Sequence, residues 1–137
     1  MDSQTLLVTD LDGTLWFDGE TCHPKSLLAF RDLQERNIAI LVATGRRLRI
    51  VADSFSQFNW EIPCLLLNGS LCHDFAKDRT VFSVPFSNES SASILEIFRL
   101  HGLSPTIYAD DSFVYVKKPT TSNAHIAAIG RDLVPTN

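Results

Sequence analysis

The sequence lacks the features of a membrane, secreted or nucleic-acid-binding protein. It has no apolar run long enough for a transmembrane helix, and no positively charged segment of the kind that opens a signal peptide. Dense Lys/Arg runs are missing too: the largest basic cluster is Arg46, Arg47 and Arg49, and the formal net charge is -4. We therefore expect a cytoplasmic protein that binds neither nucleic acid nor a membrane.

Cysteine is scarce and shows no pairing pattern. Cys22, Cys64 and Cys72 are odd in number and have no metal-ligand spacing, so we expect reduced thiols. The chain also lacks internal repeats and low-complexity segments. Its 137 residues, 45% apolar and 20% charged, fit one globular domain, or one domain plus part of another.

The first half alternates short apolar runs with helical patterns. Residues 5–9, 38–42 and 64–67 predict buried strands, and apolar residues at helical spacing predict helices over 24–37 and from 48 onward. The order strand, helix, strand, helix, strand predicts an α/β fold with a Rossmann-like parallel sheet. Ligands of such sheets gather beyond the carboxyl ends of the strands.

The pattern changes after residue 69. The expected elements are a hairpin, a helix, two further strands and a last helix, at residues 71–86, 87–102, 106–109, 113–117 and 122–133. This order lacks alternating crossovers and predicts a module of α+β type. We therefore divide the chain into residues 1-69 and residues 70-137.

An acidic turn follows the first predicted strand. Asp10 and Asp12 stand two residues apart, and carboxylates this close repel each other unless a cation, such as magnesium with its preference for oxygen ligands, lies between them. Gly13 would let the backbone approach a ligand closely. A calcium loop starting at Asp10 fails, because Leu15 occupies the position that needs glycine. A simple turn remains the alternative.

The other two predicted strands also end in polar residues. Thr44, Gly45 and Arg46 follow the second strand, and Asn68 with Gly69 follows the third. All three motifs therefore fall at the carboxyl ends of the strands, where a ligand site is expected. The alternatives are ordinary ones: Thr44 caps the following helix, Arg46 is a solvated residue, and Asn68 belongs only to a turn.

These motifs carry a family resemblance. Residues 6–15 (LLVTDLDGTL) are similar to the first motif of the haloacid dehalogenase superfamily, and residues 41–46 (LVATGR) resemble its second motif. The pair Asn68-Gly69, just after the third predicted strand, resembles the sequence of Cof-type sugar phosphatases at this place. In those enzymes a class IIB α/β cap is inserted between the second and third motifs. The resemblance runs through the whole chain, and it implies a core covering 1-69 and an incomplete cap over 70-137.

The resemblance implies a role for each motif residue. Asp10 would attack phosphorus and form an aspartyl-phosphate, and Asp12 would protonate the leaving group and then help to activate water. Magnesium (Mg2+) would be held by the Asp10 side chain and the backbone carbonyl of Asp12. Phosphate or substrate binding would fall to four residues: Thr44, Gly45, Arg46 and Asn68.

The sequence departs from the family pattern after the cap-like region. No lysine occurs on core-like sequence after Thr44, and Asp110-Asp111 lacks both the preceding glycine and the acid four residues later that the fourth motif requires. We therefore expect a truncated chain with weak magnesium binding and poor turnover. An exposed sheet edge would favour self-association.

Three functions stay open. The first is a magnesium-dependent hydrolase of a small phosphorylated metabolite, such as a sugar phosphate. The second is a phosphosugar mutase or a relative of sucrose phosphatase. The third is a catalytically inactive fragment that acts as a binding or regulatory module.

Overall fold

The computed structural model describes most of the chain: residues 5–17, 21–58, 61–109, 114–117 and 133–136. The chain divides into two compact units, Met1–Val84 and Pro85–Asn137.

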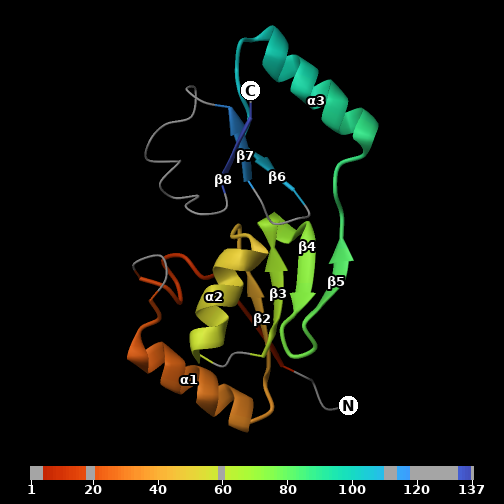
Figure 1. Cartoon of the computed structure of the whole chain (residues 1–137). Coiled ribbons are helices and arrows are strands. Elements are labelled where there is room, and N and C mark those ends of the chain that lie inside the picture. Colours follow the sequence, from red (N-terminus) through yellow and green to blue (C-terminus); the bar gives the residue numbers. More distant parts are fainter. Residues whose placement is uncertain (1–4, 18–20, 59–60, 110–113, 118–132, 137) are drawn as a thin grey trace. The chain divides into compact units, whose positions relative to one another are not determined.

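The first unit is built on a parallel sheet (Figure 1). Strands β1 (Leu6–Thr9), β2 (Ala39–Ala43) and β3 (Pro63–Leu66) lie side by side in chain order, with β1 and β3 each parallel to β2. Helices α1 (Pro24–Glu35) and α2 (Leu48–Phe58) connect them. This is the strand and helix order that the sequence predicted, and the α/β fold class is confirmed.

A hairpin extends this sheet. Strand β4 (Leu71–Asp74) pairs antiparallel with β3, and β5 (Arg79–Ser83) pairs antiparallel with β4, which gives the order β1-β2-β3-β4-β5. Only the short 3-10 turn Leu67–Gly69 and Ser70 separate β3 from β4, so the chain must fold back beside β3. The compact unit therefore ends at Val84 and not at residue 69. The functional boundary between 1-69 and 70-137 stays a prediction.

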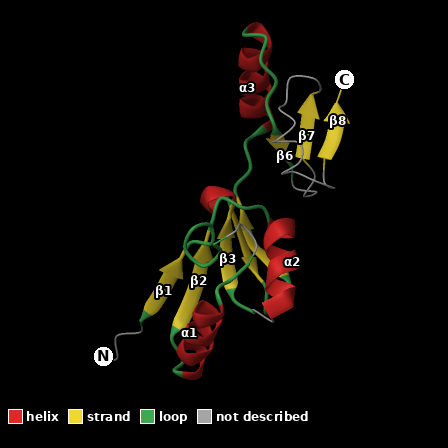
Figure 2. Cartoon of the chain, turned by 90° about the vertical axis from the view of Figure 1, so that its left-hand side faces the viewer, coloured by secondary structure: helices red, strands yellow, loops and turns green. Residues whose placement is uncertain are grey.

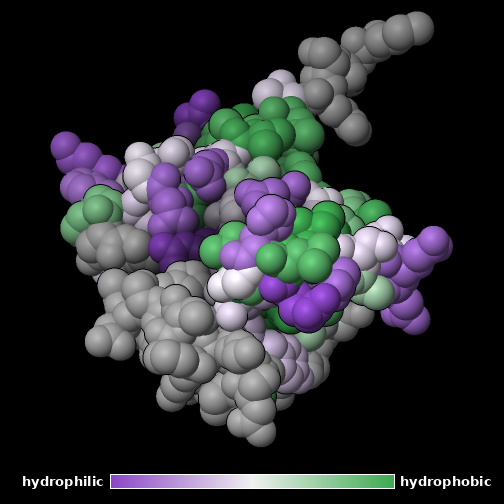
Figure 3. Space-filling model, turned by 90° about the horizontal axis from the view of Figure 1, so that it is seen from above, coloured by the Kyte–Doolittle hydropathy of each residue, from purple (hydrophilic) through white to green (hydrophobic). Residues whose placement is uncertain are grey.

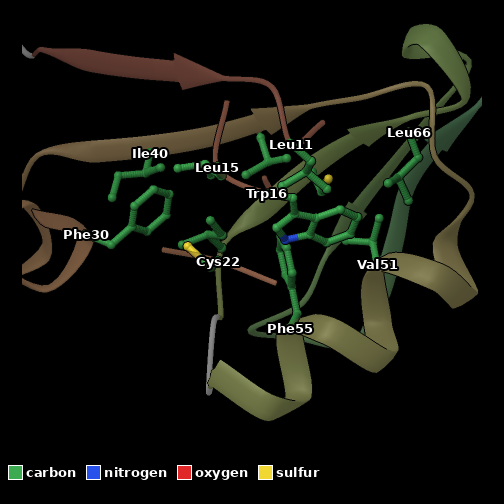
Figure 4. Packing of buried hydrophobic residues seen from close by; sticks show 12 residues of the cluster. Leu11, Leu15, Trp16, Cys22, Phe30, Ile40, Val51, Phe55 and Leu66 are labelled. Atoms are coloured by element: carbon green, nitrogen blue, oxygen red, sulfur yellow. The ribbon is translucent and has the colours of Figure 1, made fainter. Parts of the chain in front are cut away.

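Both helices cover the same face of the sheet (Figure 2). Right-handed crossovers that connect neighbouring strands in one direction place their helices on one side. Ile40, Val42 and Cys64 point to that side and are at most 5% exposed. Figure 4 shows Trp16 beside Phe55 in this core, within the cluster that α1, α2 and the strands build together.

The opposite face of the sheet has no such cover in the described part of the chain. Leu6 and Val8 are 55% and 53% exposed, and they share this face with the half-buried Leu41, which pairs with Val8. None of the three belongs to the core cluster. Among the described strands β1 is also the last one at its side of the sheet, so no described strand pairs with its outer edge, and self-association remains a prediction.

The second unit contains one described helix and three described strands. They are α3 (Asn88–Leu100), β6 (Ile107–Tyr108), β7 (Val114–Lys117) and β8 (Leu133–Thr136). Ser87 caps α3, since its side chain accepts the Ser90 N–H, and Gly102, with φ 64°, lies just past the helix end as predicted. In the space-filling view of the chain from above, hydrophobic (green) and hydrophilic (purple) residues lie next to each other on the surface of the described part (Figure 3).

The end of the chain corrects one expectation. Leu133 was expected in a last helix, but it begins β8, which runs parallel to β7. In the described part β8 pairs only with β7, and an edge strand of this kind tolerates Pro135, which has no N–H to donate. The rest of that predicted helix, and Asp110-Asp111, lie outside the described residues.

Two simpler expectations concern cysteines and membranes. Cys22, Cys64 and Cys72 are free and buried, and burial raises the pKa of the Cys64 thiol to about 12. No helix among the described residues combines the length and the apolar character needed to cross a bilayer.

Candidate active site

Leu11 anchors the acidic turn that follows β1. Its side chain is fully buried, while Asp10 and Asp12 on either side of it are exposed. The Leu11 N–H donates to Asp10 Oδ1 at 2.7 Å. The Leu11 carbonyl accepts three N–H groups, from Thr14 at 3.1 Å, Leu15 at 2.9 Å and Trp16 at 2.7 Å. One buried leucine thus bends the chain so that both carboxylates face solvent.

Asp12 forms a two-bond ion pair with Arg46, 34 residues away in the chain. Arg46 Nε donates to Asp12 Oδ2 at 2.8 Å, and Nη2 donates to Oδ1 at 2.6 Å. The hydrogen bonds from this guanidinium hold the pKa of the Asp12 carboxyl below its usual value, although partial burial opposes the shift. Asp12 is therefore ionised, and the acidic turn is joined directly to the loop after β2.

Trp16 lies beneath this ion pair. The guanidinium carbon of Arg46 is 5.9 Å from the centre of the Trp16 ring, and the Trp16 side chain is fully buried. A cation at this distance from an aromatic face is attracted to it. Trp16 was not among the site residues predicted from the sequence. The signal that could have found it was an aromatic side chain four residues after Asp12, a spacing too short for the two residues to lie on separate helices or strands.

Thr44 is held inside the loop that follows β2. Its N–H donates to the Leu65 carbonyl at 2.9 Å, its side chain is 6% exposed, and its Oγ1 accepts the Arg46 N–H at 3.2 Å. Because α2 begins only at Leu48, Thr44 stabilises its own loop and does not occupy the helix-capping position. A hydroxyl that accepts one hydrogen bond can still donate its own proton to a ligand.

The loop after β3 is bonded to the loop after β2. The Leu67 N–H donates to the Arg46 carbonyl at 3.1 Å, and the Asn68 N–H donates to the Thr44 carbonyl at 3.2 Å. The side chain of Asn68 also lies against Gly45. These contacts bring Asn68 to the residues of the second motif, as their shared place at the strand ends suggests.

The predicted site residues thus occupy one edge of the sheet. Direct contacts join Asp12 to Arg46 and the Thr44–Arg46 loop to Asn68. Asp10 belongs to the same edge through register, because Thr9 pairs with Val42 just before both strands end. The edge combines two carboxylates, a hydroxyl, a guanidinium and an amide, a set that suits an anionic ligand together with a cation.

The acidic turn offers oxygen donors for a divalent cation, but few of them. Within the described residues no group of three or more His, Cys, Asp and Glu could hold a metal ion. The Asp12 carboxylate is bonded to Arg46, so the donors that fit magnesium are the Asp10 carboxylate and backbone carbonyls. Magnesium takes oxygen ligands and usually keeps several waters, so this donor set suits it as part of a site.

A family model matches most of the sequence. The model describes a haloacid dehalogenase-like hydrolase and matches residues 7–132. The chain belongs to this family. Its resemblance to the superfamily, predicted from the motifs, is therefore confirmed.

The curated relatives are longer than this chain. It is 24% identical over 110 residues to the pyridoxal phosphate phosphatase YbhA of Escherichia coli, an alignment that covers 80% of this chain and 40% of the relative. The chain thus spans about half the length, or less, of the curated relatives it matches.

Solved structures share the fold. The phosphatase BT1666 of Bacteroides thetaiotaomicron superposes with a TM-score of 0.78 at 20% identity, covering 97% of this chain and 49% of that one. A subclass IIB sugar phosphatase, BT4131, gives a TM-score of 0.68 at 19% identity, covering 97% of this chain and 52% of that one. At these identities the likeness establishes the fold.

Proposed function

We propose that the acidic turn and the Thr44–Arg46 loop form part of a phosphomonoester hydrolase site that acts on a small phosphorylated metabolite. The observation that carries this proposal is the contact of Asp12 with Arg46, which joins a pair of carboxylates to a loop rich in donors for an anion. A nucleophilic carboxylate beside a guanidinium and a hydroxyl is a chemical set suited to phosphoryl transfer. Membership of a hydrolase family supports the same chemistry.

In the proposed reaction, a carboxylate oxygen of Asp10 attacks phosphorus. The bond between phosphorus and the ester oxygen breaks, and Asp12 gives its proton to the departing alkoxide. Water then attacks the phosphorus of the aspartyl-phosphate. Asp12 takes the proton of that water, and inorganic phosphate leaves, which restores the Asp10 carboxylate.

The Asp10 carboxylate and the backbone carbonyl of Asp12 would hold magnesium, whose charge offsets the repulsion between the attacking carboxylate and the phosphoryl group. Thr44 would donate its hydroxyl proton to a phosphoryl oxygen, with the Gly45 N–H beside it. These two donors come from a loop whose backbone is already fixed by hydrogen bonds, so little reorganisation is needed on binding.

Arg46 has to change partner during this cycle. Its two hydrogen bonds keep the pKa of Asp12 low, and Asp12 cannot act as an acid while it remains paired. A bound phosphoryl group offers the guanidinium another bidentate anion. In this proposal, substrate binding draws Arg46 away and allows Asp12 to take up its proton.

Phosphate release tests the proposal. The panel would contain sugar phosphates and pyridoxal phosphate, assayed with magnesium on this chain. Asp10→Asn should lower the rate about 10³-fold or more, because it removes the nucleophile. Asp32→Asn, the same chemical change on the exposed side of α1, should leave the rate unchanged. Equal rates for the wild type and Asp10→Asn would show that Asp10 is not the nucleophile.

A binding module is the second candidate, favoured by the small number of acids at the site within the described residues. Calorimetry with inorganic phosphate and magnesium distinguishes it from the enzyme. Binding without release of phosphate from any ester supports the module, and release supports the hydrolase. Recovery of a phosphosugar with its phosphoryl group moved would indicate a mutase.

A further inference from the structure

The turn after β3 has an unusual backbone. Leu67, Asn68 and Gly69 all have positive φ angles, of 50°, 57° and 92°. Glycine adopts such angles without cost, and asparagine tolerates them, but a leucine there is uncommon and strained. Strain of this kind persists only where the surrounding structure holds it, and it concentrates at functional sites.

The backbone bonds of this turn explain what holds it. The Leu67 N–H reaches the Arg46 carbonyl, the Asn68 N–H reaches the Thr44 carbonyl, and the Thr44 N–H reaches the Leu65 carbonyl. The left-handed angles aim the two N–H groups of the turn back at the loop after β2. The two loops are therefore fixed to each other on both sides of Gly45.

Gly45 itself does not need to be a glycine for backbone reasons, because its φ lies outside the left-handed region. The nearby Asn68 side chain explains why a glycine stands at this position. A methyl group at Gly45 would lie 3.0 Å from Asn68 Oδ1, 3.7 Å from Cγ and 3.9 Å from Nδ2. An alanine there would press against the Asn68 amide, which would have to move.

We infer that Asn68 is a positioning residue, whose side chain rests on Gly45 and sets the geometry of the Thr44–Arg46 loop. This inference rests on the proposed function for its purpose, which is to aim the Gly45 N–H and the Thr44 hydroxyl at a phosphoryl group. Asparagine suits this position for two reasons. It tolerates the left-handed backbone, and its amide is neutral, whereas a carboxylate there would repel an anion.

A pair of substitutions and their combination test the contact. Gly45→Ala should lower the urea midpoint and shift the amide resonance of Arg46, because the added methyl displaces the Asn68 amide. Both effects should largely disappear in Gly45→Ala/Asn68→Gly, where the amide is gone. If Gly45→Ala has the same effect in both backgrounds, Asn68 does not fix this loop and the inference is overturned.

Phosphate binding tests whether Asn68 helps to aim the donors of the Thr44–Arg46 loop at a phosphoryl group. The probe is inorganic phosphate with magnesium present, and its binding is followed by the Gly45 and Arg46 amide resonances. Asn68→Gly should weaken phosphate binding about tenfold, which corresponds to about 1.4 kcal/mol. The matched control is Asn37→Gly, since Asn37 also has a positive φ (55°) but lies at the end of α1. The control should bind phosphate like the wild type.

The outcomes separate the inference from the proposed function. Unchanged phosphate affinity in Asn68→Gly, or an equal loss in Asn37→Gly, overturns the positioning role. If the wild type binds no phosphate while the coupling between Gly45 and Asn68 is measured, the hydrolase proposal fails and the positioning of the loop by Asn68 stands.

Discussion

The two faces of the first unit's sheet differ in how they are covered. On the face that carries α1 and α2, Val42 and Cys64 are completely buried. On the other face, Leu6 and Val8 keep more than half of their surface exposed. Both sets are apolar and lie on neighbouring strands, so hydropathy alone does not distinguish them.

The difference teaches where the stability and the chemistry of this unit reside. Burial of apolar surface is the main favourable term in folding, and here it is concentrated on one face. The site residues lie at the carboxyl ends of the parallel strands, where Leu11 and Trp16 anchor them on the covered side. Substitutions on the covered face should therefore destabilise the protein most, those at the site less, and those on the open face least.

The largest expected effect comes from the covered face. Phe55 is 1% exposed, and its ring centre lies 4.8 Å from that of Phe75, so Phe55→Ala should cost about 3–5 kcal/mol of unfolding free energy, measured by urea denaturation. Leu6→Ala on the open face should cost no more than about 0.5 kcal/mol. Similar losses for the two variants would show that both faces are packed, contrary to the comparison.

An intermediate effect on the unfolding free energy is expected at the site, at the carboxyl ends of the strands. Arg46→Gln removes the partner of Asp12, and since the two side chains are 37% and 42% exposed, water screens the pair and the loss should be at most about 1 kcal/mol near neutral pH. Arg36→Gln, which removes the arginine of an exposed pair with Asp32 at the end of α1, provides the control.

The pH dependence of this loss has a definite sign. Because the folded state lowers the pKa of Asp12, the pair stabilises the protein above the ordinary carboxyl pKa of 3.8, and this stabilisation is lost as the pH falls through the lowered value. Urea denaturation at a series of pH values should therefore show the wild type and Arg46→Gln converging in acid. A constant difference down to the lowest pH would mean that the loss comes from another contact of Arg46.

The sequence was sufficient for the parallel strands and for the edge at which the site lies. Apolar periodicity is local, so the predicted strands 38–42 and 64–67 differ from Ala39–Ala43 and Pro63–Leu66 by one residue at each end. Parallel strands share a carboxyl edge, which explains why the motifs at their ends could be placed together.

Partner choice was harder to predict than element type. The hairpin β4–β5 was expected as a pair of strands, but alternation along a strand does not say which strand it will lie beside, and β4 joined β3. The ion pair between Asp12 and Arg46 spans 34 residues, and the contact of Asn68 with Gly45 depends on left-handed angles in the turn. Such contacts arise from tertiary geometry and leave no periodic signal.

The smallest effect on stability is expected at the two ends of the sheet, β1 and β5, where the exposed edges predict self-association. Val8→Lys and Val81→Lys each place a charge at a residue that is about half exposed, 53% and 52%, so each should change the unfolding free energy by no more than about 0.5 kcal/mol. A lysine on an edge strand opposes pairing with another chain. If chains associate through the open face beside β1, sedimentation equilibrium should show weaker association for Val8→Lys than for Val81→Lys. The reverse order would assign association to β5, and equal association in both variants and the wild type would exclude both edges.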